Sequence, residues 1–262
     1  MSARTASKEI FRVFWRLGWR AKRTRVFALL CLVPTAVLTA IKIVEVANPH
    51  FGTTAFDVFL RTMMAFYFQL FVPILAIFFG SSVINEELDN KTLVYLTTTP
   101  VPKIAIFLGK FMAHWLLCAV IIGGSLGLSF IIANFSALGT AAAWLDLAGY
   151  VGISWLALWS YCALFALLGT FMRKSILLGL FFAFGWEAVV QYFPGSTQKF
   201  TLIHYIKSLL PIQPADGGFL VFRLEPSSVA ESLLMLLFIG ALALVAAALI
   251  FKRKEYIISD SV

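Results

Sequence analysis

Six long apolar runs, separated by short polar breaks, constrain the fold of this chain more than any other feature of its sequence. A run of about 18 or more apolar residues is long enough for an α-helix to cross the hydrocarbon core of a bilayer. Hydrophobic residues make up 61% of the chain and charged residues 13%, whereas a soluble domain is nearer half apolar and a quarter charged. We therefore predict an all-α membrane protein with six transmembrane helices, at about residues 26–46, 56–83, 103–133, 144–171, 176–193 and 229–251.

Charged residues near the outer ends of the first two predicted spans have the spacing of helical ion pairs. Lys42 and Glu45 are three residues apart, and Asp57 and Arg61 are four apart. Both spacings put the two side chains on one helix face, where pairing lowers the cost of each charge. Pro34 predicts a bend in the first span, because proline disrupts the hydrogen bonding of a helix interior.

The N-terminal segment predicts an amphipathic helix at about residues 7–24 that lies on the membrane surface. Arg12, Arg16 and Arg20 recur every four residues on one face, and apolar residues repeat at helical spacing on another. This helix either anchors the chain to lipid or also contacts a cytoplasmic partner, and the two readings are compatible. We accordingly divide the chain into a connecting helix (1–25), a six-helix domain (26–251) and a cytoplasmic tail (252–262).

The segment before the last span, residues 194–228, is too polar and too rich in proline to cross a bilayer. We expect it to form an insertion on the extracytoplasmic side. Its stretch 200–210 is amphipathic and predicts a short helix that lies on the outer surface or dips into it.

The distribution of Lys and Arg predicts which side of the membrane each loop occupies. With the N-terminus inside, 16 of the 21 Lys and Arg residues fall in inner segments and 5 in outer ones. Inner loops of membrane proteins carry this excess of basic residues. Both termini and the break between the second and third spans are therefore expected in the cytoplasm, and the net charge of +8 fits loops facing anionic lipid rather than nucleic acid.

The break between the second and third spans, at about residues 84–102, predicts an exposed cytoplasmic elbow. Its first part carries Glu86, Glu87 and Asp89, and Pro100 and Pro102 mark a rigid corner at its end. Such acids are either solvated loop charges or partners for Arg and Lys of another protein, whose register they would fix. A stiff elbow joined to two spans would convert movement of that protein into helix tilt.

No motif in the chain supplies energy for transport. The phosphate-binding pattern G-x-x-x-x-G-K-[ST] is missing, because Gly109-Lys110 is preceded by Ile104 in place of glycine and followed by Phe111 in place of Ser or Thr. We therefore expect no ATPase activity and no bound cofactor in this chain. Metal and disulfide chemistry is not expected either, because the three cysteines are isolated within apolar runs, at Cys31, Cys118 and Cys162.

Glu187 is the one carboxylate well inside a predicted span. An acid in this position is either a hydrogen-bonded structural residue or the functional lining of a cavity. The motif HExxH is absent, so an intramembrane hydrolase would depend on Glu187 as its best candidate.

The elbow resembles the signature of the ABC-2 type permease family, the membrane subunits of ATP-binding cassette transporters. The likeness is carried by residues 85–93, by Thr99-Pro100-Val101 and by the Leu108-Gly109-Lys110 step that opens the third span. Residues 161–169, followed by a basic turn, also look like the fourth span of that family. The resemblance covers essentially the whole chain, including its six spans and its outer insertion.

This resemblance implies a half-transporter of a bacterial cytoplasmic membrane, because two permease chains, identical or paralogous, would together form the pathway. Two ATPase subunits holding ATP and Mg²⁺ would dock below it, and export is the expected direction. By position, Glu86, Glu87, Asp89, Thr92 and Pro100 would belong to the coupling helix that contacts the ATPase.

Two other functions stay open at this point: a membrane scaffold or maturation factor for an extracytoplasmic enzyme, and the intramembrane hydrolase already named. The residues do not choose among lipid, peptide, drug and polysaccharide as substrate.

Overall fold

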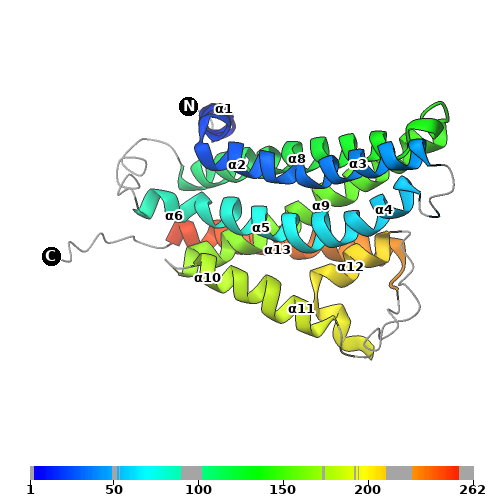
Figure 1. The fold of residues 1–262 in the computed structure, drawn as a ribbon. Helices are drawn as coiled ribbons and strands as arrows, with labels where there is room; N and C mark the ends of the chain where they lie inside the picture. The colour runs from blue at the N-terminus through cyan, green and yellow to red at the C-terminus, as the bar shows by residue number, and fades with distance from the viewer. Residues whose placement is uncertain are drawn as a thin grey trace.

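The computed structural model of this chain describes residues 3–48, 52, 54–89, 102–172, 175–191, 193, 195–210 and 226–253, and every regular element in these ranges is a helix (Figure 1). Five of these helices are long and apolar enough to cross a membrane: Lys22–Ala47, Ala55–Asn85, Lys103–Ala133, Ala141–Phe171 and Val229–Arg253. The predicted fifth span takes the form of a shorter apolar helix, Ser175–Val190. The all-helical class is as expected, and the three-part division of the chain stays a prediction.

The first span is interrupted where Pro34 predicts a bend. Helix α2 (Lys22–Cys31) ends one residue before Leu32, and α3 (Val33–Ala47) begins directly after it. Pro34 then occupies the first turn of α3, where a missing N–H breaks no hydrogen bond within the helix. The two helices together form one apolar crossing.

The second span contains two π-helical segments on either side of a proline. It runs through α4 (Ala55–Thr62), η1 (Met63–Phe71), α5 (Val72–Leu75), η2 (Ala76–Gly80) and α6 (Ser81–Asp89). In a regular α-helix the ring of Pro73 would clash with the carbonyl group of Gln69, and Pro73 has no N–H to donate to it. A wider turn before the proline removes that conflict.

Helix α6 extends past residue 84, where the elbow was expected to begin, and continues to Asp89. The backbone of Glu86, Glu87 and Asp89 therefore belongs to the last turns of a helix. Thr92 and Pro100 lie outside the described residues.

Helices α8 (Lys103–Ala133) and α9 (Ala141–Phe171) form the centre of the bundle, joined through the short helix η3 (Phe135–Ala137). Helix α9 packs against α8, α13, α6 and η2. Glycines permit these close contacts, since a Cβ added at Gly80 would lie 2.8 Å from the carbonyl oxygen of Cys162 and one at Gly169 would lie 3.0 Å from that of Ser81. The second span therefore lies backbone to backbone against α9.

The last third of the chain forms a helical hairpin and the final span. Helices α10 (Ser175–Leu180), η4 (Phe181–Trp186) and α11 (Glu187–Val190) run continuously, and η5 (Gly195–Phe200) leads into α12 (Leu202–Leu209). Helix α12 packs against α13 (Val229–Arg253) and α9, and its residues 202–206 are buried. The predicted amphipathic helix thus forms part of the bundle and does not merely lie on it.

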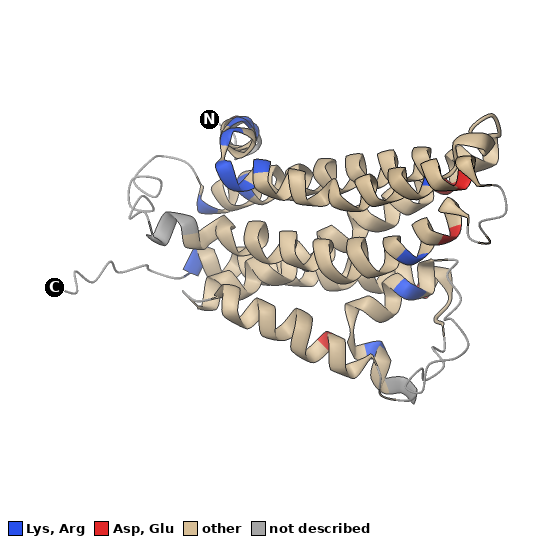
Figure 2. Cartoon of the chain, viewed as in Figure 1, with Lys and Arg blue, Asp and Glu red and all other residues tan. Residues whose placement is uncertain are grey.

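Helix α1 (Ala3–Arg20) runs across the direction of the long helices, at the end of the bundle where α13 also ends (Figure 1). It packs against α8, where a Cβ at Gly109 would lie 2.7 Å from the carbonyl oxygen of Ser7. Lys and Arg gather at this same end, whereas the opposite end carries acidic as well as basic residues (Figure 2). The basic asymmetry predicted from the sequence is therefore an asymmetry between the two ends of the bundle.

Candidate functional site

A cavity of about 400 Å³ opens beside the second span, and segments far apart in the chain line it. Residues from η1 and from the η4–α11 segment contribute most of its surface, and α5, α9 and α12 add one residue each. The side chains are mostly apolar and aromatic, with four polar residues among them. The lining consists of Ala65, Phe66, Phe68, Gln69, Leu70, Pro73, Tyr161, Ala183, Phe184, Glu187, Ala188, Gln191 and Ile203.

Glu187 holds three helices together at the inner wall of this cavity. Its side chain is buried, with 3% of the residue exposed. The hydroxyl group of Tyr161 on α9 donates a hydrogen bond to Oε2, and the backbone N–H of Leu202, at the start of α12, donates to Oε1 at 2.9 Å. The acid therefore serves as a structural tie and also lines a cavity, so its two sequence-based readings are compatible.

The sequence did not predict these partners of Glu187. Tyr161 lies within an apolar run of the fourth span, and nothing in its spacing distinguishes it from a lipid-facing tyrosine. Leu202 contributes only its backbone N–H, which every residue except proline possesses. Both contacts arise from the packing of α12 against the bundle, and only the tertiary structure reveals them.

A second polar contact lies one helical turn further along the same wall. The ammonium group of Lys207 on α12 donates to the side-chain oxygen of Gln191 at 2.7 Å. Burial lowers the pKa of Lys207. Nearby on α12, the ring Nε2 of His204 lies 3.2 Å from the hydroxyl oxygen of Ser227, and burial lowers the pKa of this histidine too. The segment before the last span is thus attached to the bundle through buried polar contacts.

At the basic end of the bundle, the three arginines predicted for a surface helix lie on the exposed side of α1. Arg12 pairs with Glu9 at 2.8 Å, and Arg16 and Arg20 are exposed. The other side of α1 rests on α8, where the ammonium group of Lys110 lies 4.9 Å from the centre of the Phe14 ring. Such a cation–aromatic contact stabilises the docking of one helix on another.

Lys110 is a residue whose environment sequence reasoning missed. It is one of the 16 basic residues that the sequence assigns to the inner segments, yet only 1% of it is exposed. Its position about two turns inside α8, under α1, explains its burial. The hydrogen bond from the side-chain nitrogen of Asn85 to the hydroxyl oxygen of Ser175, at 2.6 Å, similarly joins α6 to the start of α10. The basic end is therefore a packed junction of α1, α6, α8 and α10.

A group of hydroxyl side chains is buried between the first three spans. The hydroxyl oxygen of Tyr67 lies 2.8 Å from that of Ser125 and 2.9 Å from that of Ser129, and Thr35 lies 2.8 Å from Ser129. Ser125 also donates to the carbonyl oxygen of Cys31, next to the break between α2 and α3. Hydroxyl groups in this position satisfy the backbone carbonyl groups that an interrupted helix leaves free.

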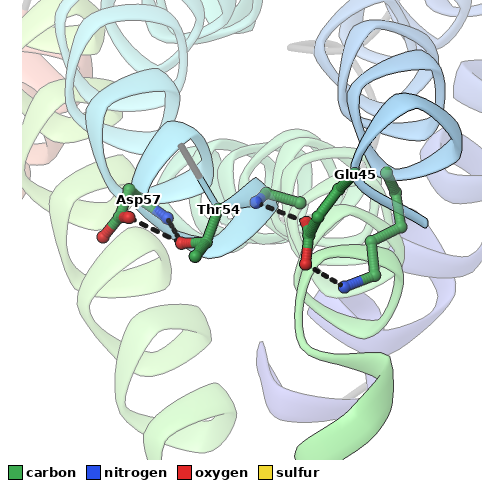
Figure 3. Close-up of polar contacts among 5 residues, drawn as sticks. Glu45, Thr54 and Asp57 are labelled. Carbon is green, nitrogen blue, oxygen red and sulfur yellow. Dashed lines mark hydrogen bonds and ion pairs between the residues drawn. The ribbon is translucent and has the colours of Figure 1, made fainter. Parts of the chain in front are cut away.

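At the other end of the bundle, Glu45 joins α3 to α4 (Figure 3). One carboxylate oxygen accepts from Lys42 at 3.0 Å, as the sequence spacing predicts, and the other accepts from the backbone N–H of Ala55 at 2.7 Å. The expected pairing of Asp57 with Arg61 is wrong. Asp57 instead accepts from the hydroxyl group of Thr54 at 2.6 Å, because Thr54 caps the first turn of α4.

Across the ranges that the structure describes, no group of three or more His, Cys, Asp or Glu side chains has the arrangement of a metal site. The three cysteines are buried and free. The cavity beside Glu187 is large enough for a small ligand, and four polar residues line it.

A protein-family model described as "ABC-2 family transporter protein" matches residues 28–256 of the chain. The matched segment begins within α2 and ends beyond α13, so it includes most of the first long apolar helix and the whole of the other four that the structure describes. A search of curated proteins finds no match.

Proposed function

Because the chain belongs to the ABC-2 family of transporter proteins, we propose that it is the permease subunit of an exporter driven by ATP hydrolysis in separate subunits. Membership makes the chain an integral membrane component of a transporter, and the family works with an ABC ATPase. Our proposal adds the direction of transport, the pairing of two permease chains, the two ATPase copies and the location in a bacterial cytoplasmic membrane.

The observation that carries the proposal is the gathering of Lys and Arg at the end of the bundle where α1 lies and α13 ends (Figure 2). Basic residues are retained on the cytoplasmic side of membrane proteins. We therefore assign this end to the cytoplasm, where an ATPase would dock. The described ends of the second and third spans, at Asp89 and Pro102, flank the connection that the ATPase would contact.

We also propose that Ser175–Val190 crosses the membrane as a sixth span. Its 16 residues extend about 24 Å at 1.5 Å per residue, which is less than the hydrocarbon core of about 30 Å. A locally thinner bilayer accommodates such a short span at modest cost.

Movement of the ATPase would be transmitted to the membrane helices through α6, the cytoplasmic end of the second span. This helix packs against α9 and is joined to α10 by the Asn85–Ser175 hydrogen bond. A push on the acidic end of α6 would therefore move α9 and α10 with it, as a rigid body. The acids Glu86, Glu87 and Asp89 would give the ATPase a charged surface to hold.

The proposal is tested by co-purification of the full chain with an ATPase encoded beside it, followed by ATPase and transport assays of the complex. The double variant Glu86→Lys, Glu87→Lys should uncouple ATP hydrolysis from transport. The matched control Glu231→Lys changes a carboxylate at the start of α13, at the other end of the bundle, and should leave coupling intact. A chain that purifies without any ATPase would support the scaffold or maturation function and refute the proposal.

A further inference from the structure

We propose that the cavity beside Glu187 binds an apolar molecule carrying one protonated amine, and that this molecule is a substrate of the transporter. The second part rests on the proposed function, whereas the binding itself depends only on the cavity.

The size and surface of the cavity fit a small amphiphilic molecule. A volume of about 400 Å³ falls within the range of about 300–1,000 Å³ that small-molecule sites occupy. Phe66 and Phe184 are 43% and 39% exposed, whereas Phe68 is fully buried. The aromatic surface thus extends from the interior to an accessible rim, where an apolar body could enter.

The charge of the cavity selects a cation. Glu187 is its one carboxylate, and its lining contains no Lys, Arg or His. Each carboxylate oxygen has room for about two hydrogen-bond donors, and Tyr161 and Leu202 each provide one. An amine would therefore add to the existing contacts of Glu187 without displacing them. Since Glu187 is 3% exposed, a ligand of this cavity would meet it away from bulk water.

The groups around Glu187 fit the remaining parts of such a ligand. Phenylalanine and tyrosine rings attract a cation over their faces, and Phe68 and Tyr161 both line the cavity. Gln69 is exposed, and its amide makes no side-chain hydrogen bond with any residue that the structure describes. It is available to a polar substituent at the rim. Gln191 instead accepts from Lys207, so the amine is expected at the Glu187 end.

Two π-helical segments of the chain, η1 and η4, both line this cavity. A π-helical turn is rare and is found frequently at functional sites, because it redirects side chains and disturbs the regular backbone hydrogen bonds. Pro73 accounts for the disturbance in η1, but no proline lies in η4. The meeting of two such segments at a single space is a second, independent reason to assign a ligand to it.

The test compares three probes that share one apolar body: 1-naphthylmethylamine as the cation, 1-naphthalenemethanol as the neutral form and 1-naphthylacetate as the anion. Binding to the full chain in phosphatidylcholine nanodiscs is measured by equilibrium dialysis at pH 8, with empty nanodiscs as the blank. The wild-type chain should bind the amine about tenfold more tightly than the alcohol, and the anion least.

Glu187→Gln should reduce the amine-to-alcohol preference to about one, because glutamine keeps the size of the side chain and removes its charge. The matched control Glu231→Gln, at an exposed carboxylate outside the cavity, should keep the preference. Ala65→Trp places a large ring at an exposed position of the lining and should weaken the binding of both probes about tenfold or more.

A preference for the amine that survives in Glu187→Gln would overturn the assignment, as would equal binding of the anion. If Glu187→Gln does not fold, Ala65→Trp decides the matter, since unchanged amine binding there places the probe elsewhere. Failure of the proposed function is a separate result: the chain would bind the amine but assemble with no ATPase. In an assembled complex, the amine should stimulate ATP hydrolysis, and no stimulation would refute its role as a substrate.

Discussion

Replacing Glu45 should loosen the connection between the first two spans by an amount that its contacts determine. The carboxylate accepts from the backbone N–H of Ala55, which opens α4, and Ala55 is fully buried (Figure 3). In Glu45→Ala this N–H would lose its partner, at a cost of about 1–3 kcal/mol. Loss of a negative charge at a helix N-terminus adds about 0.3–1 kcal/mol. We therefore expect a destabilisation of about 1–4 kcal/mol.

Two further variants separate these contributions. Glu45→Gln keeps an oxygen that can accept from Ala55 and loses the charge, so about 1 kcal/mol is expected. Lys42→Gln removes only the ion pair with Glu45, whose two side chains are 21% and 28% exposed, and it should cost less than about 1 kcal/mol. The predicted order of destabilisation is Glu45→Ala, then Glu45→Gln, then Lys42→Gln.

The measurement is the free energy of unfolding of the full chain in mixed micelles of rising SDS content, followed by circular dichroism. Amide hydrogen exchange provides a local readout, and peptides from α4 should exchange faster in Glu45→Ala than in Lys42→Gln. Equal effects of Glu45→Ala and Lys42→Gln would refute the reasoning, because the ion pair and not the helix N-terminus would then account for the stability.

Three other changes test separate contacts by the same unfolding measurement. Gly240→Ala should destabilise the chain by about 1–3 kcal/mol, since the added Cβ would lie 2.5 Å from the Trp159 ring; no loss would mean that α9 and α13 pack less closely. Tyr67→Phe should cost about 1 kcal/mol by removing the hydroxyl group bonded to Ser125 and Ser129, and a neutral result would show that the remaining hydroxyl groups suffice. His204→Gln should reduce the loss of stability on acidification. Burial lowers the pKa of His204 in the folded chain, so below pH about 6.5 the unfolded chain binds more protons than the folded chain, and stability decreases as the pH is lowered. An identical pH dependence in the variant would contradict this.

The positions of the long helices could be predicted from the sequence because a membrane crossing requires a long apolar run, and polar residues mark where that run ends. The third span was expected at residues 103–133, and α8 occupies Lys103–Ala133. A proline precedes this helix and Asn134 follows it, so both ends are marked by residues that favour other structure. Composition also predicted the all-helical class.

The contacts inside the bundle could not be predicted, since they depend on which faces of the helices meet. The burial of Lys110 beneath α1 and the pairing of Glu187 with Tyr161 join segments distant in sequence. The continuation of α6 to Asp89 also depends on more than composition, because charged residues end a membrane crossing but do not end a helix. For the candidate site, the sequence indicated Glu187, and the structure adds the cavity around it.

Because η1 is π-helical, the number of residues in the second span determines how its two halves are rotated about the helix axis, as well as how long the span is. An α-helix turns by about 100° per residue, so deletion of one residue within Met63–Phe71 that restored regular α-helix would swing the two halves of this span about their common axis by roughly that angle. Gln69 and Phe66 would then be aimed away from the cavity, or Gly80 would leave the backbone of α9. The π-helical turn thus allows the second span to face the cavity on the N-terminal side of Pro73 and to pack closely against α9 on its C-terminal side.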